Sequence, residues 1–295
     1  MSILRPLRAL ALLLAAAATQ AQSPAPEAEP PKALTEALAA AVTGPGEVKL
    51  DNQATLKVPA GRRFVPQPHA GNLLRLMGNP GEHRDVRGLV LPETREGWFA
   101  LISWEGGGYI KDDDAKDWNA DDLLKSYREG TEAANEERIK LGGAAMEIVG
   151  WAEKPAYDAS THRLVWAMAS KDKGAPATAE QGVNYNTFAL GREGYLSLNL
   201  VTDLKDLPQH KAVAQELLGA IAFVDGKRYA DFDSRTDKVA EYGLAALVLG
   251  VGAKKLGLFA VIAGFLAKFA KVFLIGGIAL VGGIGKLLGR NKNTA

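Results

Sequence analysis

The sequence contains no cysteine, and this absence removes three kinds of chemistry at once. Disulfides, thiolate nucleophiles and cysteine-ligated metal sites all require that side chain. A Gly-x-Ser-x-Gly nucleophile motif is also missing. Histidine is scarce, and no two histidines have the i, i+4 spacing of a helical zinc site; the four are His69, His83, His162 and His210. The common hydrolytic and metal-dependent catalytic sets are therefore not expected.

The sequence also has no excess of charge of either sign, because its formal net charge is only +1. No block of lysine and arginine interleaved with aromatic residues stands out along the chain. Proteins that bind nucleic acid usually carry such a basic patch. A nucleic-acid partner is therefore not expected.

The first residues have the organisation of an export signal. Arg5 and Arg8 precede an apolar run at 10–18, which is far shorter than the roughly 20 residues needed to span a bilayer. Small residues follow at 19–21, so we expect a signal peptide over residues 1–21, although an uncleaved N-terminal anchor fits the same run. Residues 22–43 begin with mostly Pro, Ala, Glu and Ser. This composition predicts a flexible tether, with a short alanine-rich helix from residue 32 to 42.

The C-terminal region is apolar but lacks an uninterrupted hydrophobic run of spanning length. Lysines at 254, 255, 268 and 271 divide residues 244–288 into three pieces. Lysines near the end of a span can extend to the headgroups, which favours one transmembrane span over about 265–288 within a helical membrane-associated region at 236–290. A two-span hairpin would bury Lys254 and Lys255 at a cost of a few kcal/mol each. We expect membrane lipid as the partner of this anchor, in the bacterial inner membrane with the soluble domain on the periplasmic side.

The middle of the chain, residues 44–235, predicts a soluble α+β domain with a mostly antiparallel sheet and two main helices. Asn119 is suited to be the N-cap of a helix over 117–141, whose expected buried face is Leu123, Leu124, Tyr127, Ala134 and Ile139. A second helix is expected over 208–223. Alternating segments predict hairpins at 48–58, at 88–104, at 146–168 across a turn at 157–160, and at 184–201 across a turn at 191–194. We expect this sheet to be covered on one face.

Three polar or aromatic features of the sequence are candidate sites. The acidic residues could hold a hard cation such as calcium, or could be a solvated loop with helix-capping carboxylates; they are Asp112, Asp113, Asp114, Asp117, Asp121 and Asp122. The glycine-rich segment 105–109 lacks the Gly-Lys-Ser/Thr ending of a phosphate loop, which favours a tight turn between strands. The aromatic residues of the strands fit either a ligand groove or a core. No catalytic, cofactor-binding or metal-binding residue is assigned, and no cofactor is expected.

Several longer motifs carry a family resemblance. They are Gly108-Tyr109-Ile110-Lys111-Asp112-Asp113-Asp114-Ala115, residues 132–138, residues 150–158, Thr161-His162-Arg163-Leu164-Val165-Trp166-Ala167, residues 184–186 with 190–192, and Gly226-Lys227-Arg228-Tyr229-Ala230-Asp231-Phe232. In this order they resemble the uncharacterised bacterial membrane-anchored family catalogued as domain of unknown function 2167. The resemblance implies an exported domain followed by a glycine-rich hydrophobic tail. It implies no activity, cofactor or catalytic residue.

Three functions remain open from the sequence. The first is a non-enzymatic envelope module that binds a partner protein, a lipid or another ligand beside the membrane. The second is an accessory subunit whose glycine-rich tail packs into a membrane complex. The third is an envelope enzyme that uses Asp112–Asp114 with His162, which requires these side chains to converge within hydrogen-bond reach.

Overall fold

The computed structural model describes residues 30–249, apart from 78–81, 95, 116–117 and 141–143. The described residues from Pro31 onward belong to one compact unit. The expected signal peptide and the expected span at 265–288 lie outside the described residues. Among the helices described, none is both long enough and apolar enough to cross a membrane.

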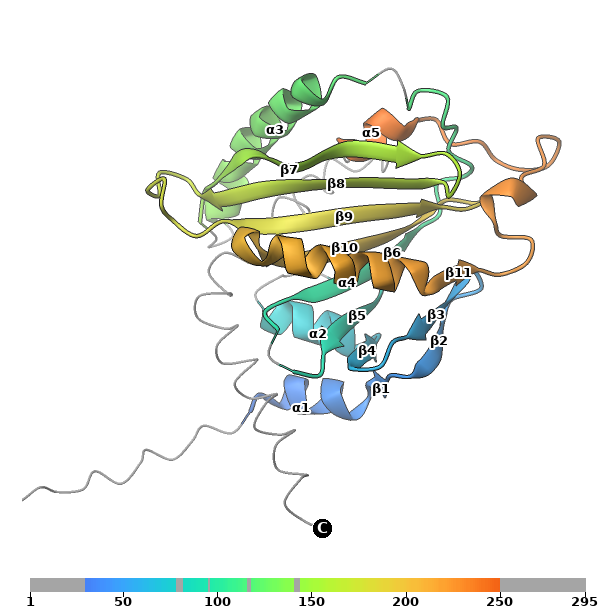
Figure 1. The fold of residues 1–295 in the computed structure, drawn as a ribbon, viewed down its shortest axis with the longest axis horizontal. Coiled ribbons are helices and arrows are strands. Elements are labelled where there is room, and N and C mark those ends of the chain that lie inside the picture. Colours follow the sequence, from blue (N-terminus) through green and yellow to red (C-terminus); the bar gives the residue numbers. More distant parts are fainter. Residues whose placement is uncertain (1–29, 78–81, 95, 116–117, 141–143, 250–295) are drawn as a thin grey trace, which may run out of the picture. The chain divides into compact units, whose positions relative to one another are not determined.

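Two antiparallel sheets form the framework (Figure 1). The larger has eight strands in the spatial order β1 (Val42–Thr43), β4 (Arg62–Pro66), β5 (Val86–Pro92), β6 (Phe99–Glu105), β10 (Tyr195–Asp203), β9 (Gly182–Leu190), β8 (Arg163–Asp172) and β7 (Met146–Asp158). The smaller has the order β11 (Ile221–Phe223), β3 (Ala54–Val58) and β2 (Gly46–Leu50). The helices are α1 (Lys32–Ala39), α2 (His69–Leu76), α3 (Ala120–Lys140), α4 (Leu207–Gly219) and α5 (Leu244–Val248). The expected α+β class with a mostly antiparallel sheet is confirmed.

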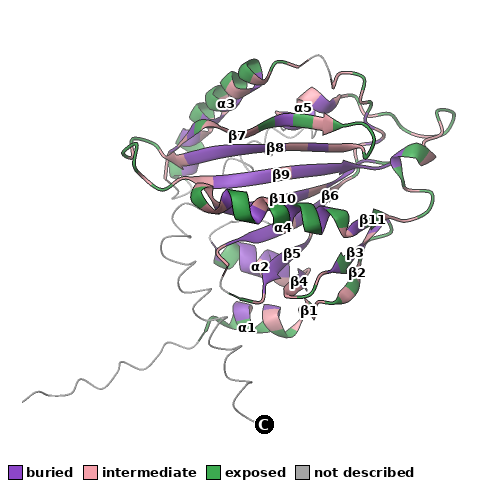
Figure 2. Cartoon of the chain, in the orientation of Figure 1, coloured by how far each residue is buried: buried purple, intermediate pink, exposed green. Residues whose placement is uncertain are grey.

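Both faces of the large sheet are covered, so the expectation of a one-sided sheet is wrong. On β8, Ala167 and Ala169 pack toward α4 and the small sheet, while Leu164, Trp166 and Met168 pack toward α3 and α5. Near the other end of the sheet, α1 and α2 cover β4 and β5. Figure 2 shows the resulting burial of β8 and β9 beneath the exposed outer side of α4. The alternation along β8 therefore separates large from small apolar residues rather than apolar from polar ones.

The local sequence predicts the hairpins well, although one turn lies two residues later than expected. The β9–β10 turn occupies 191–194, as expected. The β7–β8 turn occupies 159–162 instead of 157–160. The carboxylate of Asp158 accepts hydrogen bonds from the Ser160 amide, the Ser160 hydroxyl and the Thr161 hydroxyl, so the turn is organised by Asp158 and begins after it.

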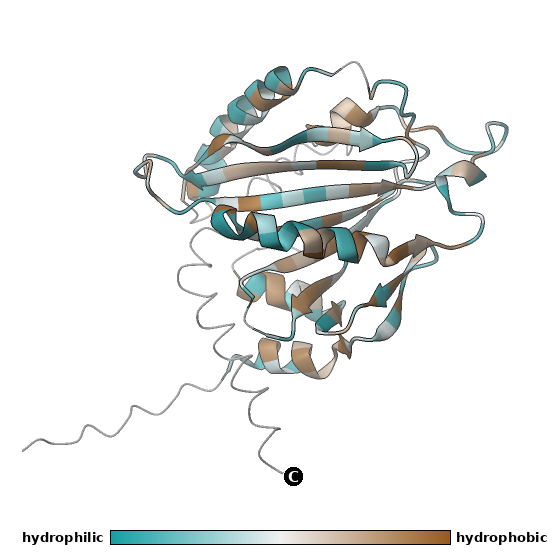
Figure 3. Ribbon diagram, in the orientation of Figure 1, coloured by the Kyte–Doolittle hydropathy of each residue, from teal (hydrophilic) through white to brown (hydrophobic). Residues whose placement is uncertain are grey.

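Helix α3 begins as expected and buries Leu123 and Tyr127 of the expected face, but its second half departs from the prediction. The Asn119 side chain accepts hydrogen bonds from the amides of Asp121 and Asp122, which is the expected N-cap. Ile139, however, is 58% exposed, and the inward residues after Tyr127 are polar; they are Thr131, Asn135 and Arg138. Figure 3 shows how hydrophilic this helix is along its length. The prediction failed in this half of the helix because Asn135 bonds to the backbone of Met146 at the sheet edge and Arg138 bonds to Asn135, so polar side chains take the inward positions.

The helix expected over 208–223 is also too long. Helix α4 ends at Gly219, and residues 221–223 pair with residues 54–56 of β3. This pairing joins segments more than 160 residues apart, so nothing in the local pattern distinguishes strand from helix there.

The folded part extends beyond both expected boundaries. Leu34 and Ala37 of α1 are buried against α2, so residues 32–39 are not part of a flexible tether. Residues 237–243 are not helical, and the α5 side chains Leu244, Leu247 and Val248 are buried with Leu123 and Tyr127 of α3. The described residues 236–249 therefore pack as part of the folded unit, beyond the boundary expected at residue 235.

His210 on α4 makes stability depend on pH. Its side chain is buried, its Nδ1 lies 2.6 Å from the Thr202 hydroxyl oxygen, and burial lowers its pKa below the usual 6.5. The unfolded chain then binds more protons near pH 6 than the folded chain, so the free energy of unfolding falls as the pH drops below about 6.5. We expect this loss between pH 7.5 and pH 5 to be smaller in His210→Gln, measured by urea unfolding. An equal loss in both proteins contradicts the assignment.

Candidate functional site

Four segments that are distant in the sequence meet at one end of the large sheet. The Tyr109 amide donates to the Lys238 carbonyl, and the Ala240 amide donates to the Tyr109 carbonyl. Gly191 pairs with Arg228, and the Leu190 amide donates to the His162 carbonyl. With the bond from the Tyr229 hydroxyl to the Ile110 carbonyl, these contacts join the segments 108–112, 161–163, 190–192 and 226–232, which carry the family resemblance, and add residues 238–240. The meeting point places polar and aromatic side chains together.

Asp112, Tyr157 and His162 form a hydrogen-bonded line at this end, which we call the His162 cluster. The Tyr157 hydroxyl donates to Asp112 Oδ2 at 2.7 Å, and it lies 3.1 Å from His162 Nδ1. A carboxylate only accepts, so the single hydroxyl proton goes to Asp112, and the hydroxyl oxygen is left to accept from Nδ1–H of His162. His162 has the uncommon φ of 52° for a side chain other than glycine. Burial first, and then the bond to Asp112, raises the pKa of Tyr157.

Aromatic rings extend this cluster into a stack. The His162 ring lies 4.1 Å from that of Tyr229, which lies 4.4 Å from Tyr109, which in turn lies 3.8 Å from Phe232. The Tyr229 hydroxyl donates to the Ile110 carbonyl at 2.8 Å, and burial raises the pKa of Tyr229. The stack therefore holds the loop at 109–112 against the segment at 229–232.

The acidic residues of the sequence have separate local roles. Asp114 accepts hydrogen bonds from the amides of Leu244 and Ala245 and so caps α5. The amides of Asp121 and Asp122 are bonded to Asn119, and Asp117 lies outside the described residues. In the described part of the chain, no three His, Cys, Asp or Glu side chains are grouped as metal ligands. Of the two interpretations of the acidic residues, a cation site or helix-capping carboxylates, the capping role is observed for Asp114.

The glycine-rich segment is not a turn between two strands. A Cβ atom at Gly107 would lie 2.1 Å from the Tyr242 hydroxyl, and one at Gly108 would lie 2.7 Å from the Lys238 carbonyl oxygen. Gly108 also has a φ of 105°. Glycine is needed at 108 because the backbone of 238–240 approaches closely there, whereas the neighbour of Gly107 is the side chain of Tyr242.

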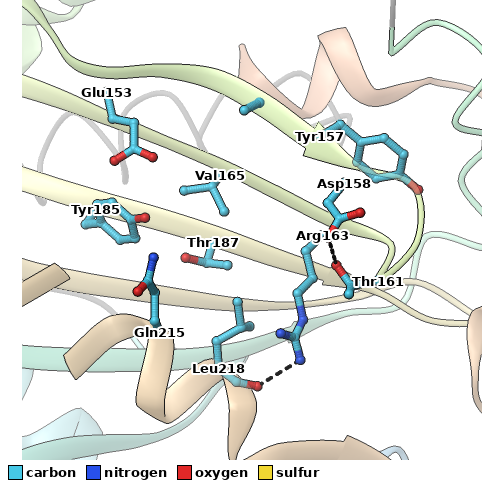
Figure 4. Close-up of a pocket in the computed structure, with 11 residues that line it drawn as sticks. Glu153, Tyr157, Asp158, Thr161, Arg163, Val165, Tyr185, Thr187, Gln215 and Leu218 are labelled. Carbon is cyan, nitrogen blue, oxygen red and sulfur yellow. Dashed lines mark hydrogen bonds between the residues drawn. The ribbon is translucent and has the colours of Figure 1, made fainter. Parts of the chain in front are cut away.

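A cavity of about 340 Å³ lies beside α4 on the other side of β8 from α3, and we call it the α4 groove (Figure 4). Its lining includes Glu153, Arg163, Val165, Tyr185, Thr187 and Gln215. Strand register explains the cavity, because three rows of side chains cross β7, β8 and β9. The middle row holds only Ala156, Val165 and Thr187, between a row with Glu153 and Tyr185 and a row with Asp158 and Arg163. Short side chains between long ones leave the space open.

The polar groups of the α4 groove are unevenly satisfied. Glu153 forms an ion pair with Lys211 at 2.6 Å, and burial followed by the Glu153 charge raises the pKa of Tyr185. Arg163 donates from Nη2 to the Leu218 carbonyl at 3.2 Å. Thr187 is only 1% exposed, and its hydroxyl has no hydrogen-bond partner. A buried hydroxyl left unpaired costs about 1–3 kcal/mol, and Gln53 Oε1 and Asn199 Oδ1 are in the same state elsewhere in the domain.

The sequence predicted some of the residues of the His162 cluster and the α4 groove. Asp112 and His162 do converge, with 3.7 Å between Oδ2 and Nδ1 and the Tyr157 hydroxyl bridging them, whereas Asp114 caps α5. Neither Asp112 nor His162 lines the α4 groove. Trp98 and Trp166 are buried in the core, whereas Tyr157 and Tyr185 line the groove. Thr187 was missed, and its signal is a hydroxyl residue on the inward face of an otherwise apolar strand.

Comparison with known proteins identifies the family. The sequence profile of the family described as protein of unknown function (DUF2167) matches residues 42–279. The chain belongs to this family. The resemblance read from the motifs is therefore confirmed, and both the His162 cluster and the α4 groove lie within the DUF2167 match.

Curated proteins and solved structures add little to the DUF2167 assignment. No curated protein matches the chain. The solution structure of cyanobacterial PsbP (CyanoP) from Synechocystis sp. PCC 6803 is 9% identical, with coverage of 61% of this chain and 92% of that chain and a TM-score of 0.36. The Ran-binding protein Mog1p of Saccharomyces cerevisiae is 12% identical, with coverage of 64% and 98% and a TM-score of 0.31. At these scores neither likeness supports a statement about this chain.

Proposed function

We propose that this DUF2167 protein is a non-enzymatic binding module of the bacterial envelope. It is anchored in the inner membrane by its C-terminal region, its folded domain faces the periplasm, and its ligand occupies the α4 groove. One observation carries the proposal: a cavity of about 340 Å³ beside α4 is lined by the polar side chains of Arg163, Glu153 and Gln215 around shorter side chains. Small-molecule sites are concave and place a few polar groups around a mostly apolar lining, and this is the general form that the groove has.

Photo-crosslinking in cells tests the groove as a binding site. Gln215 and Gln209 are both exposed glutamines of α4, but only Gln215 lines the groove. A photoreactive phenylalanine analogue is placed at one or the other position of the full chain, produced in bacteria with its own signal. We expect an adduct at position 215 that is absent at 209. Equal adduct patterns at the two positions contradict the proposal, and adducts confined to the C-terminal region favour the accessory-subunit alternative.

The placement in the membrane is tested separately. A reporter fused after Ala295 is expected to fluoresce as a cytoplasmic protein and to show no alkaline phosphatase activity as the alternative fusion, because one span brings the C-terminus inside. Protease added to the periplasm should then cleave the folded domain of the same full chain. Phosphatase activity at the C-terminus, or a domain protected from the protease, contradicts the expected topology.

The His162 cluster supports an enzyme as the second candidate. The Tyr157 hydroxyl lies at Nδ1 of His162, so the ring presents Nε2 as the nitrogen for proton transfer, which a general base requires. A binding module does not need this base. His162→Gln is therefore expected to leave the adduct at position 215 unchanged, whereas accumulation of an uncleaved or unmodified ligand in this variant favours the enzyme.

A further inference from the structure

Strand β2 is the outer strand of the smaller sheet (Figure 1). Glu47 of β2 lies opposite Lys57 of β3, and the Lys57 amide donates to the Ala220 carbonyl on the β11 side. Opposite residues of an antiparallel pair direct their backbone groups either toward each other or both away. The N–H and C=O groups of Glu47, and of Lys49 two residues later, therefore point away from β3, and no residue of the described ranges bonds to them.

We propose that a second copy of this chain pairs with this edge, antiparallel and centred on Val48. In that register Glu47 lies opposite Lys49 of the second copy, and Lys49 lies opposite its Glu47. Both are hydrogen-bonded positions, so each pair exchanges two backbone hydrogen bonds. Gly46 lies opposite Leu50, so the register uses the whole of β2. The two copies are related by a two-fold axis, and each contributes the same surface.

The charges on the edge favour this register over its neighbours. Glu47 and Lys49 are both exposed, and within the described part of the chain neither has an ion-pair partner. In the proposed dimer, Glu47 lies between Lys57 of its own chain and Lys49 of the second copy, so the charges alternate in sign across the joined sheets. A shift by two residues places Glu47 opposite Glu47 or Lys49 opposite Lys49. Like charges directly opposite each other destabilise a pair of strands.

The other face of the same edge is apolar. Val48 is partly buried against the core between the two sheets, and its partner on β3, Leu56, is fully buried. Pairing places Val48 beside Val48 of the second copy and covers its remaining exposed surface. Cross-strand pairs of this kind stabilise a sheet. The proposed pair thus keeps the pattern of the smaller sheet, which is charged on one face and apolar on the other.

The edge strand β7 of the larger sheet shows how this chain blocks pairing elsewhere. Asn135 bonds to both backbone groups of Met146, and Arg128 donates to the Ile148 carbonyl. Strand β7 also contains Pro155 and shifts of register. Such features protect an edge from other strands. Strand β2 has no proline and pairs with β3 without a shift, and its charges oppose pairing only in registers that bring like charges together.

The dimer is expected to be weak and independent of the proposed ligand. A pair of five-residue strands is smaller than the interfaces of stable complexes, which bury at least about 1,200 Å². None of the residues of β2 lines the α4 groove. The pairing therefore stands or fails separately from the adduct expected at position 215.

A single cysteine tests the pairing cleanly, because the chain has none of its own. The full chain with Val48→Cys is purified in detergent and treated with a mild oxidant. Opposite residues of a non-hydrogen-bonded pair have Cα atoms about 4.5 Å apart, which a disulfide can bridge. Lys57→Cys is the matched control, since this exposed position on β3 would lie at least about 14 Å from its counterpart. We expect disulfide-linked dimer to form at least tenfold faster with Val48→Cys, and equal rates overturn the inference.

The same Val48→Cys chain identifies a different occupant of the edge. An extended peptide from another protein could add to β2 in the same way. If the chain in intact bacteria becomes linked to another protein and not to itself, the inference of a second copy is overturned.

Charge variants of the Val48→Cys chain test the register. Glu47→Lys places two like pairs of positive charge in the dimer, and Lys49→Glu places two like pairs of negative charge. We expect each variant alone to form the linked dimer about tenfold more slowly. A mixture of the two variants should recover the rate as a dimer of one chain of each kind, because the opposing charges are then of opposite sign. Unchanged rates in the single variants, or no recovery in the mixture, overturn the inference.

Discussion

Gly194→Ala is expected to lower the free energy of unfolding by about 4 kcal/mol or to prevent folding. A Cβ atom at this position would lie 1.9 Å from the Glu105 carbonyl oxygen and 2.9 Å from its carbon. Both are backbone atoms of β6, which pairs with β10 through Tyr195 opposite Glu105, so neither can move aside without breaking this pairing. Steric strain of this kind in a packed region is among the few causes of very large destabilisation.

Gly174→Ala is the matched control for this prediction. Gly174 also has a positive φ, 77°, but nothing lies within 4 Å of its Cβ position. Its replacement by alanine is expected to lower the free energy of unfolding only by the cost of a left-handed backbone, about 1–2 kcal/mol. Urea unfolding followed by tryptophan fluorescence measures both variants. A loss at Gly194 no larger than that at Gly174 shows that the collision with Glu105 is relieved at little cost.

Asn135→Ala is expected to cost about 3 kcal/mol, although the residue lies on a helix rich in polar side chains. Asn135 Nδ2 donates to the Met146 carbonyl at 3.0 Å, and Oδ1 accepts from the Met146 amide at 2.9 Å. Strand β7 is at the edge of the sheet, so this side chain takes the place of a neighbouring strand. Its removal leaves two buried backbone groups unpaired, at about 1–3 kcal/mol each.

The adjacent residue provides a control for helix propensity. Glu136 is exposed on α3, and Glu136→Ala is expected to change the free energy of unfolding by less than about 0.5 kcal/mol. Arg138 Nη1 also donates to Asn135 Oδ1 at 2.6 Å, which adds to the cost at position 135. Similar unfolding midpoints for the two variants in thermal or urea denaturation mean that Asn135 does not hold β7 against α3.

These two positions connect the fold with the proposed site. Gly194 lies beside the segments that meet at the His162 cluster, since the Gly108 amide donates to the neighbouring Glu193 carbonyl. Asn135 holds the start of β7, the strand that carries Glu153 and Asp158. Both variants are therefore expected to act on the framework of the sites rather than on the groups that contact a ligand.

The features determined by the sequence alone are those formed by residues close together in the chain. The 191–194 turn, the hairpin of β2 with β3 and the Asn119 cap all depend on partners within a few residues, which is why local patterns predict them. The motifs that carry the DUF2167 membership are likewise continuous segments of chain.

Tertiary structure alone decided the features whose partners are distant in the chain. The pairing of β11 with β3, the burial of α5 on α3 and the approach of Asp112 to His162 each join segments separated by tens to more than a hundred residues. The α4 groove depends on which residues of β7, β8 and β9 face each other, and irregular register in the edge strand β7 changes that alignment. Local propensity does not contain this alignment, because it is set by the packing of whole strands and helices against one another.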